Sequence, residues 1–171
     1  MILVKIEGVQ GSTDLRIQGY SDGKWFVADS LSFGIDRELS ESGEQGGTED
    51  INIGVGELST VKITKSLDRA TPLLAKFAVN GNSVGVAEIH IVSGGNRPRA
   101  MMIYKLDRTF VKSWSMHDDG GDNDDPDEAV ELYFNRIAFV VAGQPTPFSW
   151  NVPTNTAWNE HGLPTLPAQQ S

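Results

Sequence analysis

Three consecutive stretches decide the fold class: Glu57-Leu-Ser-Thr-Val-Lys-Ile-Thr-Lys65, then Thr71-Pro-Leu-Leu-Ala-Lys-Phe-Ala-Val-Asn-Gly81, then residues 83–92. The first and third carry apolar residues at every second position, as strands with one buried face do: Val61 and Ile63, then Ala87, Ile89 and Ile91. In the middle stretch Thr71 can cap a helix, Pro72 suits the first helical position, and Gly81 suits the left-handed residue that ends it. The pattern predicts a strand, a helix of about three turns and a second strand.

The rest of the chain has the periodicity of strands. We expect them over residues 1–7, 25–35, 100–116, 130–141 and 148–152. The apolar positions change parity at Asn135-Arg136, which predicts a β-bulge there. The predicted fold is mainly β: a single-domain β-barrel of antiparallel strands with one short α-helix on its outside. Residues 1–152 are expected to form the barrel domain and residues 153–171 a Pro-rich C-terminal tail.

Composition excludes several classes of protein. The chain has 171 residues, enough for one domain with a substantial core. Its net charge of −9 without a basic stripe argues against nucleic-acid binding, and the lack of cysteine excludes disulfides and thiolate metal sites. No run approaches the ~20 apolar residues that cross a membrane, and the N-terminus is charged too early for a cleaved signal peptide. We expect no further effector domain after Val152, because too few residues follow it to fold independently.

The acidic run from His117 to Glu128 is the obvious candidate for a calcium site, because hard cations prefer converging carboxylate oxygens. It does not match an EF-hand loop. A loop starting at Asp122 places Pro126 at its fifth position and Asp127 where glycine is required. We interpret the run as a solvated hairpin tip, and its response to divalent cations stays open.

The sequence also contains no convincing pattern of catalytic residues. The three histidines, His90, His117 and His161, are far apart and lack zinc-site spacing, and His90 is placed on the exposed face of its strand. Ser115 with His117 and Asp118 has neither a nucleophile elbow nor an oxyanion hole. We therefore expect no enzyme activity, no cofactor and no metal site. Among the tryptophans, Trp25 and Trp114 are assigned to the core, and Trp158 to packing against the domain or a neighbour.

Five segments resemble motifs of the Hcp family, the tail-tube proteins of bacterial type VI secretion systems, in the same order along the chain. They are Gly8 to Thr13 (G-x-x-G-x-S), Leu31 to Ile35 (L/W-S-F/W-G), Lys65 to Leu74 (K-x-x-D-K-x-S/T-P-x-L), Val130 to Phe134 (V-x-L-x-F) and Phe148 to Val152 (G-W-D/N-I/V). The acidic loop at 117–128 departs from the family, whose matching loop is often rich in glycine and serine.

The resemblance implies a structural tube subunit. Hcp-like chains form hexameric rings that stack into a tube, which a contractile sheath expels and whose lumen carries effectors. The implied partners are further copies of the chain, a VgrG-like spike, sheath and baseplate proteins and effector cargo. The implied location is the bacterial cytoplasm during assembly, then the extracellular space or a target cell. Open strand edges on the barrel would suit ring closure, which pairs them. The alternatives are a tube subunit of a phage or other contractile injection device and, less favoured, an enzyme on a β scaffold.

The resemblance also suggests roles for individual residues. Along 25–35, one face carries Leu31, Phe33 and Ile35 toward the core, and the other carries Ser30, Ser32 and Gly34 toward solvent or a water-filled lumen. In an Hcp-like ring this second face would line the lumen, with Ser32 placed to touch cargo. Residues 36–56 lack periodicity and are expected to form a long inter-subunit loop that includes Glu38, Glu41, Gly43, Gly46 and Gly47. From the helix, Leu74, Phe77 and Ala78 should press on the barrel, with Lys76 and Asn80 in water.

Overall fold

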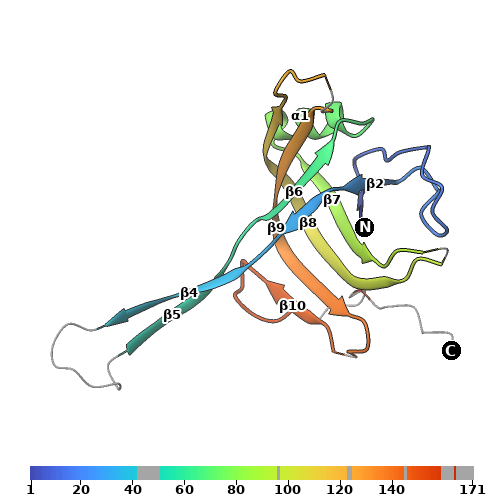
Figure 1. Cartoon of the computed structure of the whole chain (residues 1–171). Coiled ribbons are helices and arrows are strands. Elements are labelled where there is room, and N and C mark those ends of the chain that lie inside the picture. The colour runs from blue at the N-terminus through green and yellow to red at the C-terminus, as the bar shows by residue number, and fades with distance from the viewer. Residues whose placement is uncertain (42–50, 96, 123–124, 145, 159–163, 165–171) are drawn as a thin grey trace.

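A computed structural model of the chain shows a β-barrel with one helix packed on it and a two-stranded ribbon that projects from it (Figure 1). It describes residues 1–41, 51–95, 97–122, 125–144, 146–158 and 164. The elements are β1 (Ile2–Ile6), β2 (Trp25–Ala28), β3 (Ser30–Ser32), β4 (Ile35–Glu41), β5 (Ile51–Leu58), β6 (Val61–Ser66), α1 (Thr71–Asn80), β7 (Ser83–Val92), β8 (Ala100–His117), β9 (Asp127–Val141) and β10 (Phe148–Asn151). The predicted mainly β class, with an antiparallel barrel and an outer helix, is confirmed.

The barrel closes through one interrupted strand. Its hydrogen-bonded order is β2-β1-β7-β8-β9-β6-β3, with β10 added beside β9. Only Asp29 separates β2 from β3, and its backbone N–H donates to the carbonyl oxygen of Thr64 on β6 at 2.7 Å. The strand that begins beside β1 therefore continues beside β6 and nearly closes the barrel, while the outer edge of β10 pairs with no other named strand among the described residues.

The core forms where the alternating apolar residues meet inside the barrel. Val61, Ile63, Ala87 and Ile89 are at most 1% exposed, as their spacing predicted. Leu31 and Phe33 also pack against this core. Ile35 does not: it is 48% exposed, contrary to the prediction, because the chain leaves the barrel before it and enters the ribbon.

The helix has the predicted bounds, and its contacts are those expected from the sequence. Leu74 is fully buried, Phe77 and Ala78 are half-buried against the core, and Lys76 and Asn80 are exposed. Gly81 ends the helix in the left-handed region with φ 69°, and its N–H donates to the carbonyl of Phe77.

The N-cap of the helix is Ala70 and not Thr71, the residue that the sequence offered as a cap. Ala70 is the N-cap and makes no side-chain capping bond, so Thr71 is the first helical residue and Pro72 the second. The Asp68 carboxylate instead accepts a hydrogen bond from the backbone N–H of Ala70 at 2.8 Å. The Thr71 hydroxyl is thereby available for a buried network described below.

The predicted bulge at Asn135-Arg136 is wrong. The β8–β9 ladder pairs Asp107 with Arg136 and Thr109 with Phe134, so the register is the same on both sides of Asn135 and no residue is inserted.

The change of buried face is nevertheless real, since Phe134 and Ile137 both point into the core. The partner strand β8 changes its buried face at the same point, between Leu106 and Thr109. Arg108, which stands opposite the change, has φ 49°, a left-handed conformation that reorients β8 locally while the pairing continues. The register shift of this ladder lies farther along β8, between Val111 and Ser113.

The expected long loop is largely a β ribbon, which corrects the prediction for residues 36–56. β4 and β5 pair antiparallel. Ile35 pairs with Leu58 at the barrel end, Glu41 pairs with Ile51 at the far end, and the ribbon leads away from the barrel (Figure 1). Periodicity could not reveal it, because a ribbon outside the core is held by backbone hydrogen bonds and needs no buried face. In the part of the chain that the structure describes, neither outer edge of the ribbon pairs with another strand.

Residues 9–24 cover the outer face of β1, β2 and β7. Leu15, Ile17 and Tyr20 pack there on a small cluster formed by Leu3, Trp25 and Val92. His90 lies beneath this cover: its Nδ1 is 3.0 Å from the Tyr20 hydroxyl and its side chain is 14% exposed. Its predicted exposure is therefore wrong, although the strand alternation correctly pointed it away from the barrel interior.

The described part of the tail covers β8 and β9. Trp158 is 4% exposed, and its ring lies over the side chains of Arg136 and Lys105, at 5.2 and 5.9 Å from its centroid. The Ser149 hydroxyl donates to the carbonyl oxygen of Trp158 at 2.7 Å. Trp158 thus packs against its own barrel, one of the two places expected for it.

Candidate functional site

The small polar face predicted at Ser30 and Ser32 continues across neighbouring strands. Ser30 pairs with Thr64 and Ser32 with Lys62 across β3 and β6, and these pair in turn with Ala129 and Glu131 on β9. Directly paired residues point to the same side of a sheet, and the residues between them form the barrel core. We call this outer surface the polar platform: Ser30, Ser32, Lys62, Thr64, Ala129 and Glu131.

Most side chains of the platform are small and project only a short way from the sheet. The hydroxyls of Ser30 and Thr64 lie 2.6 Å apart and bond to one another. Gly34, the third predicted residue of this face, is exposed, and a Cβ placed on it would meet no atom within 4 Å. Its N–H donates to the Ser59 hydroxyl at 2.9 Å, which ties the end of the platform to the turn after β5.

Charge is concentrated at one end of the platform. Glu131 accepts a hydrogen bond from the Thr60 hydroxyl at 3.0 Å and lies between two ammonium groups, Lys62 Nζ at 3.8 Å and Lys112 Nζ at 3.7 Å. The Thr60 hydrogen bond, together with the two lysines, lowers the pKa of Glu131, so this carboxylate is ionised at neutral pH.

A groove opens beside these charges, with a volume of about 560 Å³. Its apolar wall comes from Leu58, Phe134 and Val152, and Tyr133 stands at its rim, 45% exposed. This volume is within the roughly 300–1,000 Å³ of pockets that hold small-molecule ligands. We call it the lysine groove, because Lys62 and Lys112 form its polar side together with Glu131.

Sequence reasoning identified Ser30, Ser32 and Gly34 but missed the groove. Lys62 could have been placed on the platform from the alternation Val61, Ile63 alone. Lys112 could not, because the register shift at this point of β8 breaks the alternation.

The residues predicted for inter-subunit contact fall on or beyond the ribbon. Glu38 is exposed on β4, and Glu41 is the last residue of that strand. Gly43, Gly46 and Gly47 lie outside the described residues.

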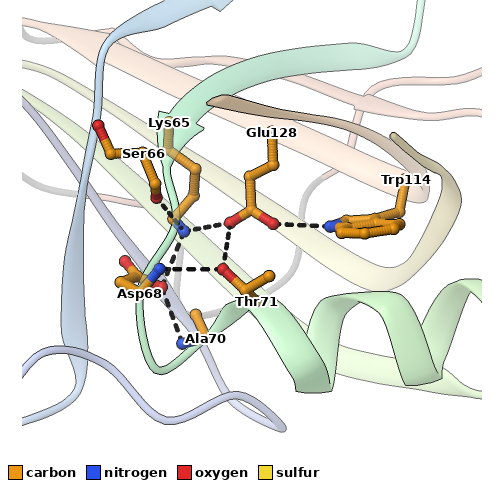
Figure 2. A network of polar contacts seen from close by, with 7 residues as sticks. All are labelled: Lys65, Ser66, Asp68, Ala70, Thr71, Trp114 and Glu128. Atoms are coloured by element: carbon orange, nitrogen blue, oxygen red, sulfur yellow. Dashed lines mark hydrogen bonds and ion pairs between the residues drawn. The ribbon is translucent and has the colours of Figure 1, made fainter. Parts of the chain in front are cut away.

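A buried polar network holds the helix to the barrel (Figure 2). The Lys65 ammonium donates to the Glu128 carboxylate, to Asp68 Oδ1 at 2.8 Å and to the carbonyl of Ser66 at 2.9 Å. Both Lys65 and Glu128 have fully buried side chains. Glu128, the last residue of the acidic run, is therefore not part of a solvated tip.

Both carboxylate oxygens of Glu128 accept a further hydrogen bond within the network. Oε1 also accepts from the Thr71 hydroxyl at 2.9 Å, and Oε2 accepts from Trp114 Nε1 at 2.6 Å. The Thr71 hydroxyl in turn accepts from the backbone N–H of Asp68 at 3.0 Å. The Lys65–Glu128 pair at its centre is fully buried and its polar atoms are hydrogen-bonded, so the network stabilises the fold and offers no position for a substrate.

The histidine and carboxylate sets that the sequence analysis weighed and rejected do not lie together in the described residues. His117 is 79% exposed and pairs with Asp119 at 2.8 Å, at an exposed strand end. Within the described ranges, no three His, Asp or Glu side chains meet in a way that could hold a metal ion. Likewise, no helix among these residues has the length and apolar content needed to cross a membrane.

Comparison with known proteins decides the family. The sequence model of the family described as "Type VI secretion system effector, Hcp" matches residues 3–140. The chain belongs to the Hcp family. The match runs from β1 almost to the end of β9, and so includes the polar platform and the buried network. The segment from Lys65 to Leu74, which resembles a motif of the family, supplies three members of that network: Lys65, Asp68 and Thr71.

Solved structures agree with this assignment. A structure described as a type six secretion system protein is 26% identical, with a TM-score of 0.74 over 91% of this chain and 97% of that one. Hcp1 from Salmonella typhimurium is 18% identical, with a TM-score of 0.70 over 92% and 97% of the two chains. Hcp1 from the E. coli EAEC 042 pathovar is 16% identical, with a TM-score of 0.70 over 88% and 96%. Among curated protein sequences, none matches the chain.

Proposed function

We propose that this Hcp-family chain is a tube subunit of a type VI secretion system: it forms hexameric rings that stack into a tube, and the tube carries effectors in its lumen when a contractile sheath expels it. The observation that carries the proposal is the family match over residues 3–140. It also favours a secretion system over a phage or another injection device. The proposed partners are further copies of the chain, a VgrG-like spike, sheath and baseplate proteins, and effector cargo. The chain would act in the bacterial cytoplasm during assembly and afterwards in the extracellular space or a target cell.

The ribbon is the proposed assembly element. The edges of β4 and β5 pair with no described strand beyond each other and are available to a neighbour. Charged side chains such as Asp36, Glu38 and Glu57 protect such edges from indiscriminate pairing. In the proposal, the segment with Glu38, Glu41, Gly43, Gly46 and Gly47 makes the contact between subunits or between rings.

The polar platform is the proposed lumen surface. Ser30, Ser32 and Gly34 are exposed, and their small side chains would leave room inside a ring. In this arrangement Ser32 would lie where cargo passes, and α1 would lie on the outer wall with Lys76 in solvent.

Native mass spectrometry of the purified chain tests the ring directly. We expect six copies per particle and multiples of six for stacked rings. A chain that stays monomeric at high concentration contradicts the proposal. Removing residues 42–50 should leave folded subunits that no longer form tubes, and tubes of unchanged length would contradict the role of the ribbon.

The lumen assignment has a clean chemical test, because the chain contains no cysteine. In assembled rings, Ser32→Cys should react with a small maleimide but only slowly with a maleimide on a bulky polymer, while Lys76→Cys should react with both. Equal rates for the bulky reagent at the two positions would place Ser32 outside the lumen. A bulky Ser32→Trp substitution should reduce cargo retention while rings still form.

A further inference from the structure

We propose that the lysine groove binds an acidic segment of a cargo protein, in which an apolar side chain stands next to a carboxylate. The inference rests on the proposed function for the origin of the segment, and on the groove itself for its chemistry. The groove continues the polar platform, since Lys62 and Glu131 belong to both.

The charge of the groove selects an acidic ligand. The chain as a whole carries −9, yet two ammonium groups converge here on one carboxylate. Both lysine side chains are 61% exposed, so their ammonium groups can be reached from solvent. A local excess of positive charge attracts an acidic partner.

The ammonium groups of Lys62 and Lys112 have N–H donors that Glu131 does not use. Their Nζ atoms lie 3.8 and 3.7 Å from the Glu131 oxygens, longer than the roughly 2.7–3.2 Å of an N–H···O hydrogen bond. Glu131 Oε2 is already hydrogen-bonded to the Thr60 hydroxyl at 3.0 Å. Each ammonium group has three N–H donors, so an incoming carboxylate can bind between the two lysines without displacing Thr60.

The apolar wall selects the neighbouring side chain. Leu58, Phe134 and Val152 form one side of the groove, and the Tyr133 ring stands at the rim, 6.4 Å from the ring of Phe134. An apolar side chain on that wall would lose its contact with water while the adjacent carboxylate meets the lysines. Aromatic rims of this kind supply contact area at low entropic cost.

The test uses the full-length chain and a fluorescent peptide with alternating Leu and Glu residues; in the control peptide, Gln replaces Glu. Fluorescence anisotropy should give a measurable Kd for the acidic peptide, at or below about 1 mM, and weaker binding of the control. Lys62→Gln and Lys112→Gln should each weaken binding by about two- to fivefold, and the double variant by about tenfold, as for exposed charge pairs. Binding should also weaken with added salt.

Two variants separate this site from a general charge effect. Lys76→Gln removes one positive charge on α1 and should leave the Kd unchanged. Glu131→Gln removes the carboxylate that competes for the lysines and should tighten binding by about two- to fivefold, a change that a merely structural residue would not produce. Equal binding of the two peptides, unchanged binding by both lysine variants, or weaker binding by Glu131→Gln would overturn the inference.

Ring order, measured on the same samples, separates the two proposals. Peptide binding by a chain that forms no rings would remove the tube function but keep the groove. Rings that bind no peptide would keep the tube and remove the groove. Groove variants that break the rings, without any peptide binding by the parent chain, would make the groove a contact between copies and overturn the cargo assignment.

Discussion

The buried Lys65–Glu128 pair gives the sharpest prediction about stability. Lys65→Met removes the ammonium group but keeps most of its volume. Glu128 then remains as a fully buried carboxylate with only two neutral donors, the Thr71 hydroxyl and Trp114 Nε1. A buried charge that loses its partner cannot recover its hydration, so the folded state bears the full desolvation cost.

The expected loss is about 3–5 kcal/mol in the free energy of unfolding, the range found when one member of a buried ion pair is removed. For a domain of 150–250 residues, 1 kcal/mol lowers Tm by roughly 2–4 °C, so Lys65→Met should lose roughly 10 °C. The double variant Lys65→Met/Glu128→Met removes both charges. It should be more stable than Lys65→Met alone, with a coupling energy of about 2 kcal/mol between the two positions.

The assay is urea unfolding followed by tryptophan fluorescence and circular dichroism, at one protein concentration because assembly adds stability by mass action. Lys76→Met is the matched control: the same substitution at an exposed helical position should change stability by no more than about 0.5 kcal/mol. If Lys65→Met lost no more stability than this control, or if the double variant lost the sum of its two single changes, the buried pair would not be an interdependent stabilising unit.

Three further changes follow from the structure. Gly11→Ala should destabilise the fold strongly, by about 3 kcal/mol or more, because the new Cβ would lie 2.3 Å from the backbone of Lys24 and Trp25, whereas Gly34→Ala points into open space and should change Tm little. The hydrogen bond with His90 lowers the pKa of Glu88 to about 2, aided by the Lys5 ammonium at 3.1 Å. A lowered carboxyl pKa stabilises the folded state above the ordinary carboxyl range and loses this effect as pH falls toward the folded value. The stability deficit of Glu88→Gln should therefore be constant above about pH 5 and shrink steadily toward pH 2 in acid titrations, and a deficit independent of pH would refute it. Trp158→Ala should cost about 3 kcal/mol and expose the outer face of β8 and β9 to hydrogen exchange, whereas unchanged exchange would show that the tail contributes no cover.

The order of strands and helix could be predicted because their signals are local. Period-two alternation at Val61, Ile63, Ala87 and Ile89 states which side of a strand must avoid water, and Pro72 and Gly81 limit where a helix can run. The ribbon was missed because β4 and β5 are held by backbone pairing with each other, while residues 36–56 show no alternation in the sequence.

The candidate site could be predicted only in part. Ser30 and Ser32 follow from the alternation around Leu31 and Phe33, which reach the core. The lysine groove requires Lys112 to lie beside Glu131, and the register shift in β8 that places it there depends on the pairing of two long strands. No spacing in the sequence records that shift.

By itself, the sequence determined where the barrel strands and the helix at 71–80 run and which family the chain resembles, because backbone preference and alternation act between near neighbours. Only the tertiary structure decided which polar groups are buried. Lys65 and Glu128 are 63 residues apart, and each looks like an ordinary surface charge until the other, with Thr71 and Trp114, closes around it. His90 likewise points away from the barrel, as predicted, but is covered by a segment some 70 residues earlier in the chain. Alternation predicts which side chains point away from the core. Whether these side chains are buried depends on which distant segment packs over them, and that contact forms only in the folded barrel.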